Sequence, residues 1–274
     1  MPGPPFRIGV IGDLLCYPLV DVIAGESEFI ASGNFQGGKP EILFDTPGTN
    51  AEKIIRGELD AALIGPIEYA QNSSEVSLYP SIGVASSGQS TTVVLCVKRE
   101  LRSISTIAIG NVSASDIVLA TIILSERFEQ KCSLVPVIGD VHTMLQRADA
   151  ALLIGDSVLV SSWDGPKLDL VDEWTDMTDL PYVHFVCAGR KGKFRKEVAS
   201  LFLSSKERAL QSLPTVAKRN ALRLSSSPER LEEQLSKYEY NFDGTLKEAL
   251  GEFFRYAFYH GILPDIPDIE QFTE

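Results

Sequence analysis

Short apolar runs alternate with amphipathic segments along the first two thirds of the chain, and one of these runs occurs twice. The first copy, Asp60–Gly65, reads Asp-Ala-Ala-Leu-Ile-Gly, and the second, Asp149–Gly155, reads Asp-Ala-Ala-Leu-Leu-Ile-Gly. A brief apolar run bounded by Asp and Gly is typical of a fully buried parallel strand. Each copy also follows an amphipathic segment, Asn50–Gly57 or Val141–Arg147. The repeat therefore predicts two similar α/β halves, with chance similarity between two Ala-Leu-Ile strands as the alternative.

The predicted elements fall in the order βαβαβ in each half, which is the pattern of a parallel sheet covered by helices. Besides the repeated runs, the segments that predict strands are residues 7–11, 41–45, 78–85, 91–98, 106–109, 132–137 and 180–188. Capping residues and amphipathic patterns predict helices over residues 14–24, 51–56, 141–147, 194–213, 227–236, 246–260 and from Ser113 or Ser115 to about Phe128. The helices beyond residue 193 are expected to pack back on the first half.

Two of the β-prone runs, residues 91–98 and 180–188, are expected to carry the chain between the halves. We therefore predict an α/β fold of two lobes, each a mostly parallel sheet flanked by helices, with a ligand held between them. Lobe 1 would contain residues 1–95 and 190–274, and lobe 2 residues 96–189, with hinges near residues 96–98 and 186–188. The length of 274 residues is sufficient for two such domains.

Composition and charge argue against several classes of function. A formal net charge of −12 argues against nucleic-acid binding, because phosphate recognition requires a basic face. The hydrophobic share of 44% is ordinary, and no apolar stretch reaches the roughly 20 residues that span a bilayer. The first six residues lack the basic and apolar regions of a secretion signal. Four dispersed cysteines favour free thiols and a cytoplasmic protein, and a monomer or homodimer is expected.

Few of the residue patterns that carry known chemistry occur in the chain. It has no Gly-x-x-x-x-Gly-Lys loop, no Cys-x-x-Cys, no pair of histidines at metal-ligand spacing and no Gly-x-Ser-x-Gly turn. The three histidines, His142, His184 and His260, lie on three different predicted elements, so neither a nucleophilic nor a metal-assisted mechanism is supported. We therefore expect no metal and no cofactor.

Turns rich in glycine and small polar residues follow the predicted strands. They are Gly12-Asp13, Gly65-Pro66, Gly88–Thr92, Gly110–Asp116 and Gly155–Ser157. Backbone N–H groups at helix starts and Ser or Thr hydroxyls bind anions, so five such turns at one sheet edge favour a cleft for a small acid. Helix capping alone would account for the same residues.

One longer motif resembles a known enzyme family. The run from Asp169 to Val183 is similar to the Asp-Leu-Gly…Trp…Thr-Gly-Leu-Pro-Phe-Val run of the chorismate dehydratases of the futalosine route to menaquinone and of their sister enzymes that make dihydroxynaphthoate. Gly57–Tyr69, Leu152–Asp156 and Phe253–Ala257 match as well, so the resemblance covers nearly the whole chain. It implies the type II periplasmic-binding-protein fold. The sister enzymes carry a His-Glu pair where this chain has Gly155-Asp156, so the dehydratase branch is favoured.

The resemblance implies a hydro-lyase that converts chorismate to 3-enolpyruvylbenzoate by losing water, with few catalytic side chains and with the substrate's own carboxylate proposed as the base. The chain departs from the family motifs at several positions. Leu15 stands where the family has an asparagine that faces the substrate, and Pro66 and Thr92 each replace a serine. Asp116 ends a Ser-Ala-Ser-Asp run where the family has Ser-x-Thr-Ser.

These observations define a candidate site in two groups of residues. Proton transfer is assigned to Asp13, Glu68 and Asp156. Substrate binding is assigned to Gly12, Leu15, Pro66, Gly88, Thr92, Ser113, Ser115 and Asp116. The alternative function is a non-catalytic protein of the same fold that binds a small carboxylate, which the departures at Leu15 and Pro66 favour.

Overall fold

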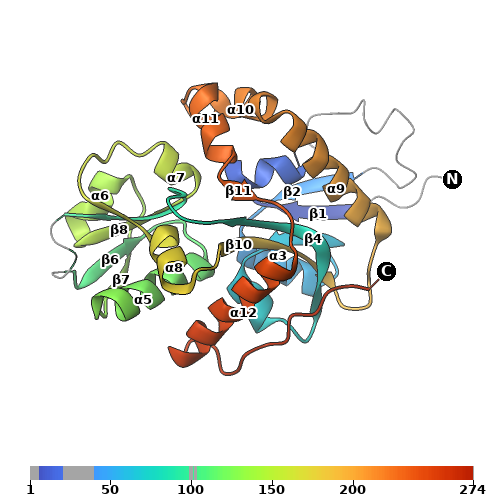
Figure 1. The fold of residues 1–274 in the computed structure, drawn as a ribbon, viewed down its shortest axis with the longest axis horizontal. Helices are drawn as coiled ribbons and strands as arrows, with labels where there is room; N and C mark the ends of the chain where they lie inside the picture. The colour runs from blue at the N-terminus through green and yellow to red at the C-terminus, as the bar shows by residue number, and fades with distance from the viewer. Residues whose placement is uncertain (1–5, 21–39, 99–100, 102–103, 274) are drawn as a thin grey trace.

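The chain folds into two lobes, each built on its own β-sheet (Figure 1). The computed structural model describes residues 6–20, 40–98, 101 and 104–273. The elements of the first lobe are β1 (Phe6–Val10), η1 (Leu14–Cys16), β2 (Pro40–Phe44), α3 (Pro47–Ile55), β3 (Ala61–Ile64), α4 (Pro66–Gln71), β4 (Val76–Ser86), β10 (Tyr182–Arg190), α9 (Lys196–Gln211), α10 (Leu213–Ala221), α11 (Pro228–Leu235), β11 (Tyr238–Glu239) and α12 (Gly244–Tyr259). Those of the second are β5 (Val93–Val97), β6 (Thr106–Ile109), α5 (Ala114–Phe128), β7 (Ser133–Pro136), α6 (Val141–Arg147), β8 (Ala150–Ile154), α7 (Asp156–Leu159), β9 (Lys167–Asp169) and α8 (Leu170–Thr178).

Both sheets have a parallel core extended by antiparallel strands. The first sheet has the order β11-β4-β10-β3-β1-β2, and the second has the order β7-β6-β8-β5-β9. Strands β2, β1 and β3 are parallel, as are β7, β6 and β8, whereas β10 and β5 run antiparallel to β3 and β8. The expected parallel arrangement therefore holds for three strands of each sheet, and each sheet as a whole is mixed.

The repeated sequence run forms the equivalent strand in each lobe. Strands β3 and β8 lie between a parallel and an antiparallel neighbour, and their Ala-Ala-Leu residues are fully buried. The Asp that precedes each strand accepts hydrogen bonds from the start of the neighbouring parallel strand. Asp60 Oδ2 accepts the N–H of Arg7 at 2.8 Å, and Asp149 Oδ2 accepts the hydroxyls and N–H groups of Ser105 and Thr106. These bonds lower the pKa of Asp149 to about 2. The repeat is thus a repeat of structure as well as of sequence.

The chain passes between the sheets earlier than the sequence indicates. Strand β5 belongs entirely to the second sheet and β10 entirely to the first. The passages are therefore residues 87–92 and 179–181, rather than the expected hinges near 96–98 and 186–188. An apolar β-prone run gains most when all of it is paired in one sheet, so the switch falls in the polar segment beside it. We propose lobe boundaries at these two passages.

Several helices differ from the sequence expectation. Helix α3 begins at Pro47 because Thr46 caps it, so it starts four residues before the expected Ala51. Helices α4, α7, α8 and α10 were not expected from the sequence pattern. In the segment expected to be helical over 14–24, η1 is followed by helical residues 17–20, and the remainder lies outside the described residues. No helix in the described ranges combines the length and apolar character needed to span a bilayer.

Aromatic packing joins the lobes on one side. Helices α4, α5, α8 and α12 contribute to one apolar core that includes residues of both sheets. At its centre Trp174 is fully buried, with its ring 5.8 Å from Phe253 and 6.5 Å from Tyr182, and its Nε1–H donates to the carbonyl of Pro181 at 3.2 Å. The Trp–Pro part of the family-like motif therefore fixes the return passage between the lobes.

Candidate active site between the lobes

A cleft of about 700 Å³ lies between the lobes and is lined by both of them. Its walls are formed by residues that follow the parallel strands, because the carboxyl ends of such strands meet at one edge of a sheet. The first lobe contributes residues 11–13, 45–48, Glu68 and Phe185. The second lobe contributes residues 111–114, Ile154, Asp156 and Ser157.

Two aspartates from opposite lobes cap each other's helical turns across the cleft. The N–H of Asp156 donates to Asp13 Oδ2 at 3.0 Å, and the N–H of Leu14 donates to Asp156 Oδ1 at 2.8 Å. Asp13 precedes η1 and Asp156 begins α7, so each carboxyl group lies at the positive end of the turn that carries the other. This reciprocal arrangement holds the lobes in a closed position.

The two carboxyl groups differ in environment. Burial and the neighbouring charge of Asp156 raise the pKa of Asp13 to about 7. Asp156 forms an ion pair with Arg223, whose guanidinium carbon lies 5.0 Å from the centre of the Tyr17 ring. Arg223 thus compensates one charge of the pair, and Asp13 is the group of the pair that takes up a proton as the pH falls through about 7.

A second group of carboxyl groups lies where α4 meets α5. Ser115 Oγ accepts the N–H of Ile67 at 3.0 Å and donates to Glu68 Oε2 at 3.4 Å. Asp116 Oδ2 accepts the hydroxyl of Ser113 at 2.6 Å. Burial raises the pKa of Glu68, and it raises the pKa of Asp116 to about 6. These groups also join the two lobes.

The glycine that ends each repeat permits these contacts. Gly155 has a φ of +49°, and a Cβ atom built on it would overlap the carboxyl group of Asp13. A Cβ atom on Gly65 would overlap the Glu68 carboxyl group and would lie 2.7 Å from Ser115 Oγ. Both glycines are therefore required by the close approach of the lobes, which the sequence repeat alone does not indicate.

The structure brings part of the predicted site together. Gly12, Asp13, Glu68, Ser113 and Asp156 line the cleft. Behind this wall lie three buried residues: Pro66, Ser115 and Asp116.

The other three predicted residues lie in other parts of the first lobe, in the passage between the sheets or beside Tyr238. Leu15 is 3% exposed and packs in an apolar cluster of the first lobe. Gly88 donates its N–H to Thr175 Oγ1 in the passage between the sheets, and the hydroxyl of Thr92 lies 2.9 Å from that of Tyr238. Their assignment to substrate binding remains a prediction.

The burial of Leu15 leads to a specific expectation for Leu15→Asn, the substitution toward the family motif. It removes apolar contacts and buries an amide, so we expect unfolding free energy to fall by about 3 kcal/mol. The melting temperature should fall by roughly 6 °C or more, whereas Leu15→Met should change little. A stable Leu15→Asn protein with increased activity would show instead that this side chain reaches the substrate.

Several lining residues were missed from the sequence. Thr46, Pro47 and Gly48 form the start of α3 at the cleft. A Thr followed by Pro is a recognisable helix start, and it could have been found. The sequence pattern did not indicate that Arg223 belongs to the site, because this residue follows α10 and lies 67 residues from Asp156 in the sequence.

Comparisons with known proteins agree with this architecture. The sequence model of the family described as menaquinone biosynthesis matches residues 6–259. A chorismate dehydratase from Thermus thermophilus is 25% identical over 249 residues, covering 80% of this chain and 89% of that protein.

Solved structures show the same fold. Protein AF1704 from Archaeoglobus fulgidus superposes with a TM-score of 0.72 at 19% identity, covering 94% of this chain and 98% of that chain. The alkanesulfonate-binding protein SsuA from Xanthomonas axonopodis pv. citri superposes with a TM-score of 0.70 at 13% identity, covering 98% of both chains. The expected periplasmic-binding-protein fold is confirmed. With its family match spanning nearly every described residue, the chain belongs to the menaquinone biosynthesis family.

Proposed function

We propose that this protein is a chorismate dehydratase, a hydro-lyase that eliminates water from chorismate to give 3-enolpyruvylbenzoate. The observation that carries the proposal is the position of the Asp13 carboxyl group, which lies in a cleft between two lobes beside Asp156, where burial raises its pKa to about 7. The similarity to the chorismate dehydratase of Thermus thermophilus supports the choice of substrate.

The reaction needs an acid more than it needs a nucleophile. Chorismate carries a hydroxyl on C4 of its ring and a hydrogen on C3, and loss of both as water makes the ring aromatic. The C3–H proton goes to a base, and we assign this role to the substrate's own carboxylate, as has been proposed for the family. The C4–O bond breaks more readily when the departing oxygen is protonated, and we assign this transfer to Asp13. Asp156 and Arg223 position the Asp13 carboxyl group and close the cleft over the ring.

The cleft accepts a dianionic substrate only when its own acids are largely neutralised. Asp45 is paired with Lys53 at 2.8 Å, and Asp156 is paired with Arg223. Asp13, Glu68 and Asp116 have raised pKa values, so each holds a proton to higher pH than an exposed carboxyl group. The helix starts at Gly48 and Ser113 then present backbone N–H donors to the substrate's carboxylates.

Chorismate should therefore bind more tightly at pH 6 than at pH 8.5. At one hundred times its Kd it stabilises the folded protein by about 2.7 kcal/mol, which raises the melting temperature by roughly 5–10 °C. At pH 8.5 the same concentration should give a clearly smaller rise, because deprotonated Asp13 and Asp116 repel the dianion. The measurement is thermal unfolding at both pH values, with the ligand-free protein at each pH as reference. An equal or larger rise at pH 8.5 would contradict the assigned electrostatics.

The direct test of the proposed reaction is incubation of purified protein with chorismate, followed by mass spectrometry and ultraviolet absorbance. We expect a product lighter than chorismate by one water, with benzoate-like absorbance. Unchanged chorismate under conditions where binding is measured would exclude the dehydratase.

The alternative is a protein that binds a small carboxylate without converting it. Its specific support is Leu15, which is buried in the apolar core where the family has an asparagine. Binding of chorismate without product would favour this alternative. For either function we propose a cytoplasmic location, supported by four cysteines that are all free in the structure.

A further inference from the structure

Buried side chains of α11 and β11 hold the first passage between the sheets, residues 87–92. Gln234 on α11 is 5% exposed, and its Nε2 donates to the carbonyl of Ser90 and to the hydroxyl of Tyr238, both at 2.7 Å. A backbone carbonyl can only accept hydrogen bonds, so the contact with Ser90 fixes which end of the Gln234 amide faces the passage. Both N–H groups of this amide are therefore engaged, one by the passage and one by Tyr238.

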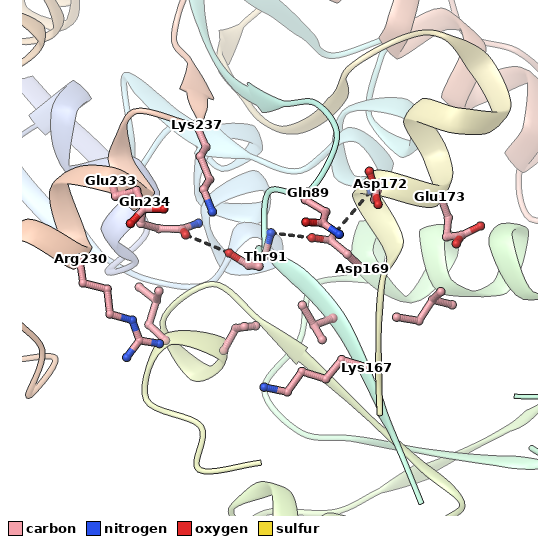
Figure 2. Close-up of a pocket in the computed structure, with 14 residues that line it drawn as sticks. Gln89, Thr91, Lys167, Asp169, Asp172, Glu173, Arg230, Glu233, Gln234 and Lys237 are labelled. Carbon is pink, nitrogen blue, oxygen red and sulfur yellow. Dashed lines mark hydrogen bonds between the residues drawn. The ribbon is translucent and has the colours of Figure 1, made fainter. Parts of the chain in front are cut away.

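The second lobe holds the same passage from the opposite side. The N–H of Thr91 donates to Asp169 Oδ2 at 2.6 Å, and the hydroxyl of Thr91 lies 2.9 Å from Gln234 Oε1. Figure 2 shows Thr91 between these two side chains, with a dashed line to each. The φ of Thr91 is +54°, a left-handed conformation that is unfavourable for a β-branched residue. Contacts from both lobes therefore keep the passage in a conformation that its sequence disfavours.

Tyr238 on β11 continues these hydrogen bonds to the last residue of the passage. Its hydroxyl lies 2.9 Å from Thr92 Oγ1, and Thr92 is 2% exposed. Because the Tyr238 oxygen accepts a hydrogen from Gln234, its own O–H can donate to Thr92. The Tyr238 hydroxyl thus connects Thr92 to α11.

Thr92 connects the passage to the candidate active site through its backbone. Its carbonyl accepts the N–H of Gly155 at 2.7 Å. Gly155 lies against the Asp13 carboxyl group, since an added Cβ atom would overlap it, and the N–H of the next residue, Asp156, donates to Asp13 Oδ2 at 3.0 Å. A continuous series of contacts therefore runs from Gln234 to Asp13, and its last two members, Asp156 and Asp13, line the cleft.

We propose that Gln234 and Tyr238 are positioning residues for the Asp13 carboxyl group. They hold Thr92, and the Thr92 carbonyl holds the Gly155 turn against Asp13. The part of this inference that concerns the reaction rests on the proposed dehydratase function, whereas the part that concerns the Gly155 turn does not. The inference gives Thr92 an indirect role, in place of the contact with substrate that the family resemblance implies.

Tyr238→Phe tests the proposal, because it removes the hydroxyl and keeps the ring, whose centre lies 6.0 Å from that of His184. The first readout is amide hydrogen exchange, which needs no substrate. Exchange at Gly155 should accelerate about tenfold more than exchange at residues 150–153 of β8, which report the loss of overall stability. Gln234→Leu should give the same pattern. Unchanged exchange at Gly155, or equal acceleration at all these amides, would overturn the proposal.

Tyr240→Phe is the matched control. Tyr240 is buried too, and the centre of its ring lies 6.4 Å from that of Tyr238. The buried Tyr240 hydroxyl has no hydrogen-bond partner among the residues that the structure describes. Removing it should leave exchange at Gly155 and the rate of dehydration at native values. Losses as large as those in Tyr238→Phe would show that any change in this part of the core disturbs the cleft, and would overturn the specific role of Tyr238.

A double-mutant cycle tests whether Tyr238 acts through Thr92. Tyr238→Phe and Thr92→Val should each lower kcat for chorismate about tenfold and change KM by less than about twofold, because Asp13 is displaced while the helix starts that bind the substrate are kept. The double variant should lose no more than either single variant, since both remove the same hydrogen bond. Losses that multiply to about a hundredfold, or a raised KM with native kcat in Thr92→Val, would place Thr92 in direct contact with the substrate and overturn the proposal.

The two readouts distinguish failure of this inference from failure of the proposed function. If the native protein does not convert chorismate, the comparison of hydrogen exchange in Tyr238→Phe and Tyr240→Phe still decides whether Tyr238 holds the Gly155 turn. If the native protein converts chorismate and Tyr238→Phe does so at the native rate, the positioning role is wrong while the dehydratase stands.

Discussion

Asp13→Asn should lower the rate of chorismate dehydration at least a hundredfold. The amide keeps the shape of the carboxyl group and can still accept the N–H of Asp156, but it has no proton to give to the departing hydroxyl. The measurement is product formation at saturating chorismate at pH 6. Asp140→Asn is the matched control, because Asp140 caps α6 by the same type of hydrogen bond and is exposed outside the cleft. A variant with native rates would remove Asp13 from the mechanism.

The pH dependence of the native enzyme gives an independent readout of the same group. Activity that requires protonated Asp13 should fall about tenfold per pH unit above the pKa of about 7. The residual activity of Asp13→Asn should lack this decline.

Stability should change in the opposite direction from activity in the same variant. The pKa of Asp13 is raised from 3.8 to about 7 by folding, so the stability that its proton gives is present at low pH and is lost as the pH rises through about 7. Asp13→Asn avoids this loss, and at pH 8 it should be more stable than the native protein by roughly 1–3 kcal/mol. Loss of activity with gain of stability would separate a catalytic role from a structural one.

Gly155→Ala should produce a second large effect by preventing closure. The added methyl group would overlap the Asp13 carboxyl group, and the left-handed φ of +49° adds strain. We expect kcat/KM for chorismate to fall about a hundredfold or more, because the Asp13–Asp156 contact cannot form. Small-angle scattering should show a larger radius of gyration than that of the native protein.

Gly192→Ala is the matched control for this variant. Gly192 also has a positive φ, of +73°, but a Cβ atom there would meet no atom within 4 Å. It therefore reports the cost of backbone strain without the collision, and its activity should stay close to native. Native activity in Gly155→Ala would contradict the role assigned to closure.

The elements that could be predicted from the sequence are those fixed by local pattern. The repeated runs became the equivalent strands β3 and β8, and Ser113 and Ser227 cap α5 and α11 as expected. Apolar runs and capping residues indicate these elements, and each such pattern involves only a few neighbouring residues. The candidate residues Asp13, Ser113 and Asp156 line the cleft because each follows a parallel strand. The carboxyl ends of such strands lie at one edge of their sheet, and the cleft is formed at that edge.

The features that could not be predicted depend on contacts between distant segments. Helix α8 carries three acidic residues in a segment that the sequence pattern left without a helix, and Trp174 stabilises it by packing on α12. Arg223 reaches Asp156 only because the helical tail returns to the cleft. Leu15 is the opposite case, because the resemblance to the family predicted a residue facing the substrate at this position, whereas the structure buries the Leu15 side chain in the core.

The most direct test of the central claim is a crystal structure of Asp13→Asn soaked with chorismate, since the slow variant should retain unreacted substrate. We expect chorismate in the cleft between Gly12 and Ser113, with its C4 hydroxyl within hydrogen-bonding distance of residue 13. Its carboxylates should lie at the starts of α3 and α5. Chorismate bound only outside the cleft, or bound in the cleft with its hydroxyl turned away from residue 13, would contradict the proposed mechanism.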